Sequence, residues 1–167
     1  MALRSALTLA LMVTASFMGV AVAAECPQAN AIYQDSDKAY EIRFSPVPAA
    51  AATSHMFKLA VLKTDLVLDG VVLPADEVER FVGTILHNCP EGDVTGADLE
   101  ACTIWEGVLY GIDAKGEIGN LPAATASAAE KLLVPDLGRS IRYSSVWDAG
   151  KATVAPWDVF TLTGCHA

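Results

Sequence analysis

Four cysteines, Cys26, Cys89, Cys102 and Cys165, constrain the fold of this chain more than any other feature. An even number of cysteines in an exported protein indicates disulfides, and four cysteines allow three pairings. Cys26 and Cys165 lie near opposite ends of the chain, whereas Cys89 and Cys102 are close in sequence. We favour the nested pairing, Cys89–Cys102 with Cys26–Cys165, because it requires only that the termini meet, as they often do in compact domains.

Redox and metal chemistry fit the spacing of these cysteines poorly. A redox pair is usually Cys-x-x-Cys, but twelve residues separate Cys89 from Cys102. A structural zinc site usually uses two short-spaced ligand pairs, and His87 with Cys89 would supply only one. We therefore assign no metal and no cofactor to this segment.

The N-terminal sequence predicts the oxidising compartment that disulfides require. One basic residue, Arg4, precedes an uncharged run of twenty residues that ends in small residues at Ala24, before Glu25. This pattern is typical of a secretory signal peptide over residues 1–24, with cleavage after Ala24 or, alternatively, after Ala23. An uncleaved membrane anchor is the competing interpretation, since the run approaches the length that spans a bilayer.

The mature chain, residues 25–167, is expected to form a single compact β-rich domain in the periplasm or outside the cell. Without Arg4 it carries ten basic and twenty acidic residues, a formal charge of −10. Nucleic acid is disfavoured as a partner because phosphate binding needs basic clusters, and no stable membrane anchor is expected after cleavage. A cationic partner fits the sign of the charge, although solubility alone also explains it.

The mature sequence is mostly typical of β-strands. Alternating or short apolar runs predict strands at 40–44, 55–62, 66–68, 71–73, 81–87, 103–112, 141–147 and 158–163. Asp69-Gly70, between two apolar runs, predicts a hairpin turn. The alanine-rich segment Ala123–Leu133 predicts the clearest helix. Thr95 with Asp98 resembles a capping box and predicts one helical turn before Cys102.

These elements predict a mainly β fold with a minor helical part. We expect an antiparallel β-sandwich or a partly closed barrel with one short helix, stapled by the disulfides. The dipeptide Trp-Asp occurs at 147–148 and 157–158, and we expect each tryptophan to be buried by a strand.

Histidines and carboxylates are the residues that could carry chemistry. His55, His87 and His166 could bind a metal, but they lack His-x-His and helical spacing, so we favour structural roles. Ser54 beside His55 could serve nucleophilic catalysis, although the G-x-S-x-G motif is absent. The candidate pair of carboxylates for sugar hydrolysis is Glu106 and Asp113. The acidic loop residues Glu91, Asp93, Asp98 and Glu100 do not have calcium-loop spacing.

Five aromatic residues in the second half of the chain have two interpretations. On one exposed face they would form a recognition patch, since Trp and Tyr are enriched in binding hot spots. We favour the other interpretation, in which large aromatic side chains fill the core. The five residues are Trp105, Tyr110, Tyr143, Trp147 and Trp157.

The sequence contains no phosphate-binding loop and no dinucleotide fingerprint, and we assign no catalytic residue. We favour an exported, non-enzymatic binding or interaction module that acts on a small ligand or on a basic protein of the cell envelope. A small exported hydrolase that uses His55 or His87 with Ser, Asp or Glu is the alternative. A structural envelope protein without a discrete site is a third interpretation.

Overall fold

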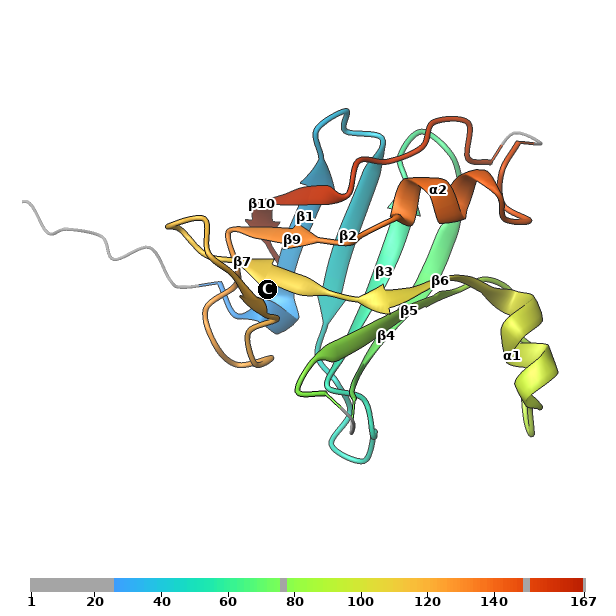
Figure 1. The fold of residues 1–167 in the computed structure, drawn as a ribbon, viewed down its shortest axis with the longest axis horizontal. Helices are drawn as coiled ribbons and strands as arrows, with labels where there is room; N and C mark the ends of the chain where they lie inside the picture. The colour runs from blue at the N-terminus through green and yellow to red at the C-terminus, as the bar shows by residue number, and fades with distance from the viewer. Residues whose placement is uncertain (1–25, 76–77, 149–150, 167) are drawn as a thin grey trace, which may run out of the picture.

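A computed structural model describes residues 26–75, 78–148 and 151–166 (Figure 1). The expected signal peptide, residues 1–24, lies outside these residues. The described strands are β1 Ala31–Asp35, β2 Tyr40–Ser45, β3 His55–Val61, β4 Val67–Pro74, β5 Phe81–Leu86, β6 Thr103–Val108, β7 Tyr110–Ile112, β8 Ile118–Asn120, β9 Lys131–Leu133 and β10 Val159–Cys165. The described helices are the 3-10 helix η1 Gln28–Asn30 and the α-helices α1 Gly96–Cys102 and α2 Leu137–Arg142.

In the described residues, ten strands form one sheet in the order β6-β5-β4-β3-β2-β1-β10-β9-β7-β8. Every neighbouring pair is antiparallel. The sheet curls into a half-barrel, with β6 and β7 crossing in front of β2 to β4 in the view of Figure 1. The structure therefore confirms the mainly antiparallel β fold and, of the two architectures considered, the partly closed barrel.

The segment 103–112 connects the two ends of the curled sheet. Its first half, β6, pairs with β5 at one end, and its second half, β7, pairs with β9 and β8 at the other end. Leu109, between the two halves, donates its amide to the carbonyl of Phe81 at 3.0 Å. The predicted long strand at 103–112 is thus present, with one interruption, and it partly closes the barrel.

The core lies inside the curl because inward side chains alternate with outward ones. Buried and more exposed residues alternate along β2 and β3, as expected for strands that bury one face. Helix α2 adds Leu137 and Ile141 to this core and packs against β6. The indole nitrogen of Trp105 in β6 donates to the carbonyl of Pro135 at 2.7 Å, which fixes the entry to α2.

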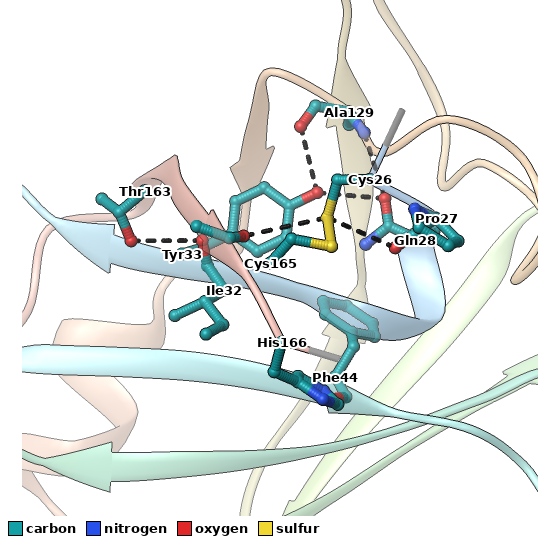
Figure 2. The surroundings of a disulfide bond; sticks show 11 residues. Cys26, Pro27, Gln28, Ile32, Tyr33, Phe44, Ala129, Thr163, Cys165 and His166 are labelled. Atoms are coloured by element: carbon teal, nitrogen blue, oxygen red, sulfur yellow. Dashed lines mark hydrogen bonds between the residues drawn. A yellow bond between two sulfur atoms is a disulfide. The ribbon is translucent and has the colours of Figure 1, made fainter. Parts of the chain in front are cut away.

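The first and last described strands are neighbours, and a disulfide joins the segment before β1 to the end of β10. β1 pairs with β10, with Ala31 opposite Cys165. Cys26 and Cys165 form a disulfide with a Cα–Cα distance of 5.7 Å (Figure 2). Cys89 and Cys102 form the second, with a Cα–Cα distance of 5.2 Å, which ties the end of α1 to the segment after β5. The pairing in the structure is the nested one.

Tyr33 anchors the surroundings of the Cys26–Cys165 disulfide (Figure 2). Its buried hydroxyl lies 3.0 Å from both the side-chain oxygen of Gln28 and the carbonyl of Ala129. The same Gln28 oxygen accepts the amide of Ala129 at 3.1 Å. Burial raises the pKa of Tyr33 well above its ordinary value, so the hydroxyl remains a donor in this network.

The expected hairpin turn at Asp69-Gly70 is wrong, because both residues lie inside β4. Gly70 lies opposite Phe57 of β3, and a Cβ at this position would overlap the Phe57 ring. Asp69 forms a cross-strand ion pair with Lys58. The chain turns instead between β3 and β4, where Lys63 has a φ of 71°.

The expected helix at Ala123–Leu133 is also wrong. The amide of Gln28 donates to the carbonyl of Ala126, and the amide of Ala128 donates to the carbonyl of Cys26, both at 2.8 Å. The end of the segment forms β9, which pairs with β10 and β7. Alanine's helix propensity is a weak preference, and these tertiary hydrogen bonds override it.

The expected strand at 141–147 is absent, because α2 occupies its beginning. Leu137 and Ile141 are buried and four residues apart, which is the spacing of one helix face. The predicted capping box is confirmed at α1: the Thr95 hydroxyl accepts the amide of Asp98 at 3.3 Å, and the Asp98 carboxylate accepts the amide of Thr95 at 3.0 Å. Strand β1 was not expected from the sequence.

Replacing Gly70 by alanine tests the close contact between β3 and β4. We expect Gly70→Ala to lower the free energy of unfolding by about 1–3 kcal/mol, because the new methyl group overlaps the Phe57 ring. Gly119→Ala on β8 is the matched control, since nothing lies within 4 Å of its added Cβ. Denaturant unfolding measures both variants, and equal stability of the two would contradict the contact.

Removing each disulfide separately tests how much each one stabilises the fold. The residues joined by Cys26–Cys165 are 139 apart in sequence, and those joined by Cys89–Cys102 are 13 apart. Because the longer closed loop restricts the unfolded chain more, we expect double alanine replacement to cost about 5 kcal/mol for the first pair and about 3 kcal/mol for the second. Denaturant unfolding measures both losses; the reverse order would contradict the expectation.

Candidate functional site

The structure separates the three histidines that could have formed a metal site. His55 lies in β3 and is 2% exposed. His87 follows β5, where its Nε2 lies 3.0 Å from the side-chain nitrogen of Asn88. His166 follows β10, where its Nε2 lies 2.7 Å from the carbonyl of Phe44. Over residues 26–75, 78–148 and 151–166, no three His, Cys, Asp or Glu side chains are grouped to hold a metal ion.

Ser54 and His55 form a hydroxyl–imidazole contact inside the barrel. The Nδ1 of His55 lies 3.0 Å from the Ser54 hydroxyl, and its Nε2 lies 2.8 Å from the carbonyl of Pro122. A carbonyl only accepts hydrogen bonds, so the Nε2 carries a proton and donates it to Pro122. In the neutral imidazole, Nδ1 is then an acceptor, and the single proton of the Ser54 hydroxyl can be donated either to Nδ1 or to the carbonyl of Val72, each 3.0 Å away. The ring is also in edge contact with Phe44 and Phe81.

The surroundings of His55 indicate a structural role. Burial lowers the pKa of His55, and the hydrogen bond to the Pro122 carbonyl only partly opposes this effect. The group at Nε2 is a carbonyl rather than the carboxylate that stabilises an imidazolium in a serine–histidine–aspartate triad. The Ser54 hydroxyl also lies 3.0 Å from the carbonyl of Val72. His55 therefore connects β3 to the segment that begins at Pro122.

The candidate carboxylates serve turns and caps. Glu106 is exposed on β6. Asp113 accepts the amides of Lys115 and Glu117 at 2.8 and 2.9 Å, which stabilises the turn between β7 and β8. In the acidic loop, the hydrogen bonds from Thr95 lower the pKa of Asp98. The structure does not bring Glu106 and Asp113 together in a described cavity.

The aromatic residues divide between the core and the surface. Trp105 is 3% exposed, which confirms the expected burial for this residue. Tyr143 and Trp157 are 80% and 63% exposed, so the expectation of a core position is wrong for both. Tyr110 and Trp147 are partly buried. Trp157 lies just before β10 and outside any strand, and the residues that precede it, Ala155 and Pro156, lie against Gly138 of α2.

Trp157 lines a groove between α2 and β10 with a volume of about 630 Å³. Its indole nitrogen donates to a carboxylate oxygen of Asp37 at 3.0 Å. Asp37 lies in the turn between β1 and β2, which the pairing of β1 with β10 places beside Trp157. An exposed indole with a fixed orientation results, because Asp37 occupies its only donor.

The charges along this groove are mostly negative. Asp136 and Asp158 line it together with Arg139 of α2, and Asp37 lies at the indole nitrogen. Three aspartates and one arginine therefore lie around the Trp157 ring, and the guanidinium of Arg139 lies over the ring of Tyr143, 5.6 Å from its centroid. The arrangement suits a cation, because a tryptophan face attracts ammonium and guanidinium groups and the carboxylates complement their charge.

Sequence reasoning identified Trp157 but missed Asp37 and Asp136. Asp37 and Trp157 are 120 residues apart, and nothing in the spacing of either residue indicates their contact. The residues around Asp37, between two strands, are typical of a turn, but they predict only that the Asp37 side chain is exposed. Helix α2 forms beside the groove because this helix buries Leu137 and Ile141. Their spacing of four residues could have indicated a helix from the sequence.

Comparison with known proteins adds no identification. No protein-family model, no curated protein and no solved structure matches this chain. In the described part of the chain, no helix has both the length and the apolar character needed to cross a membrane.

The dependence of stability on pH tests the burial of His55. Its pKa is lowered from 6.5 in the folded state, so the unfolded chain binds this proton more readily. The stability from neutral His55 is present above pH 6.5 and is lost as the pH falls through the lowered pKa. We expect His55→Gln to reduce the decline in the free energy of unfolding between about pH 7.5 and pH 5.

His87→Gln is the matched control for this experiment, since His87 is only partly buried. Burial and the charge of Lys151 lower the pKa of His87, while Asp69 opposes them. The control should therefore keep more of the wild-type decline than His55→Gln does. Denaturant unfolding at each pH gives the slopes, and an unchanged slope in His55→Gln would contradict the role assigned to His55.

Proposed function

We propose that the protein is an exported, non-enzymatic binding module that binds a cationic protein partner at the Trp157 groove. The observation that carries this proposal is the exposed indole of Trp157, held by Asp37 at the edge of a groove. Tryptophan is the residue most characteristic of binding hot spots, and a pre-oriented ring loses little conformational freedom on binding.

The charge of the groove supports a basic partner. Asp37, Asp136 and Asp158 lie around Trp157 with Arg139 as the cation among them. A lysine or arginine side chain of a partner could lie over the indole face and pair with these carboxylates. The negative formal charge of the whole chain would attract such a partner over a longer range.

Two features support a location in the periplasm or outside the cell. The two disulfides fit an oxidising compartment. The sequence of residues 1–24 has the pattern of a signal peptide, with cleavage proposed after Ala24. The mature chain would then meet its partner after export and oxidation.

Affinity capture with a matched pair of variants tests this proposal. The oxidised mature chain is expected to retain a basic protein from an envelope extract of its host, with an affinity that falls as salt increases. For the purified partner, Trp157→Ser should weaken binding about thirtyfold, corresponding to the roughly 2 kcal/mol of a hot-spot residue. Calorimetric titration measures the affinity.

Ile118→Ser is the control, because Ile118 is 60% exposed on β8 and lines a different cavity. This variant should bind the partner like the wild type. The free energy of unfolding of both variants should lie within about 1 kcal/mol of the wild-type value, since both positions are exposed. An acidic partner, or unchanged binding by Trp157→Ser, would contradict the proposal.

A further inference from the structure

A second cavity lies beside the Trp157 groove and carries the opposite charge. Its volume is about 480 Å³, and three loops that are distant in sequence line it. These are the turn between β1 and β2, the turn between β3 and β4, and the segment 151–154. All three lie at the upper rim of the half-barrel in Figure 1. The mouth of a barrel is a common position for ligand sites.

Each of the three loops contributes one lysine to this cavity. They are Lys38, Lys63 and Lys151. The ion pairs described in residues 26–75, 78–148 and 151–166 are Arg43–Glu41 and Lys58–Asp69, and neither involves these lysines. Acidic residues outnumber basic ones by twenty to eleven in this chain. The three lysines therefore give this cavity a charge opposite in sign to that of the chain as a whole.

We propose that this lysine cavity binds a small organic anion, a carboxylate or a phosphate ester attached to an apolar group. Ammonium groups bind carboxylate and phosphate oxygens by charge-assisted hydrogen bonds. Val61, Leu62 and Val154 supply apolar surface in the same cavity. The volume lies within the range of about 300–1,000 Å³ that small-molecule sites occupy.

The backbone at two of the lysines supports a role for their side chains. Lys38 and Lys63 have φ angles of 52° and 71°. This left-handed region favours glycine, asparagine and aspartate, so a lysine there costs conformational energy that a glycine would avoid. Strained residues cluster at ligand sites, where the surrounding structure maintains them.

Neighbouring groups keep the cavity cationic. Asp37 is the carboxylate that lines it, and one of its oxygens already accepts the Trp157 indole. The hydroxyl of Tyr40 donates to the carbonyl of Val154 at 2.6 Å, which holds the segment 151–154 against β2. Burial, with the charge of Asp35, raises the pKa of Tyr40 to about 12, so this hydroxyl adds no negative charge at neutral pH.

Titration of the oxidised mature chain with defined anions, followed by amide NMR shifts, tests this inference. The probes are benzoate, phenyl phosphate, acetate and inorganic phosphate. We expect saturable shifts confined to residues near 38–40, 61–64 and 151–154 for at least one of the two aromatic anions. That anion should bind at least tenfold more tightly than its small counterpart, because the apolar wall contacts only the ring. Comparison of benzoate with phenyl phosphate distinguishes carboxylate from phosphate recognition.

Matched lysine variants locate the site. Lys63→Gln combined with Lys151→Gln should weaken binding of the preferred anion at least tenfold, whereas Lys115→Gln, in the turn between β7 and β8, should not change it. If the double variant does not fold, the confined shifts of the wild type still decide the question. The inference would be overturned if neither aromatic anion showed saturable binding, or if the shifts spread over lysines elsewhere. Unchanged binding by a folded double variant would also overturn it.

The anion experiment is independent of the proposed cationic partner. Trp157→Ser should keep the affinity for the preferred anion, because its indole lines the neighbouring groove and not the lysine cavity. Loss of partner binding with retained anion binding would therefore separate the two sites. Anion binding without any captured partner would support the lysine cavity and leave the proposed function unsupported.

Discussion

The pairing of β1 with β10, joined by the Cys26–Cys165 disulfide, determines the arrangement of the rest of the structure. At one end of this pair the disulfide connects the chain's distant ends. At the other end, Asp35 lies opposite Phe160, so the turn after β1 lies beside Trp157. That turn contributes Asp37 to the indole and Lys38 to the lysine cavity. A shift in the register of this pair would therefore alter both candidate sites.

Much of the fold could be predicted because its causes are local. Alternation along 40–44 and 55–62 reports directly which face of a strand is buried. The capping box at Thr95 and Asp98 depends on atoms only three residues apart. The errors arose where distant partners decide the structure. Ala123–Leu133 is not a helix because η1, about a hundred residues earlier, pairs with its backbone.

The candidate sites were less predictable than the fold for the same reason. Sequence alone could identify Trp157 as a candidate, but its exposure depends on where the preceding residues Ala155 and Pro156 pack against α2. Turn signals could place Lys38 and Lys63 in loops. Nothing in their spacing indicates that β1 and β2, β3 and β4, and the segment 151–154 end at the same rim. These loops come together only because the sheet curls into a half-barrel.

Disulfide mapping tests most directly whether Cys26 and Cys165, near the two ends of the described residues, are covalently joined. The measurement is mass spectrometry of unreduced proteolytic peptides from protein purified from its natural host. We expect a peptide linking Cys26 to Cys165, a peptide linking Cys89 to Cys102, and no free thiol. Four free thiols would contradict the oxidising location. A linkage of Cys26 to Cys89 or Cys102 would contradict the pairing of β1 with β10, which places Cys26 beside Cys165.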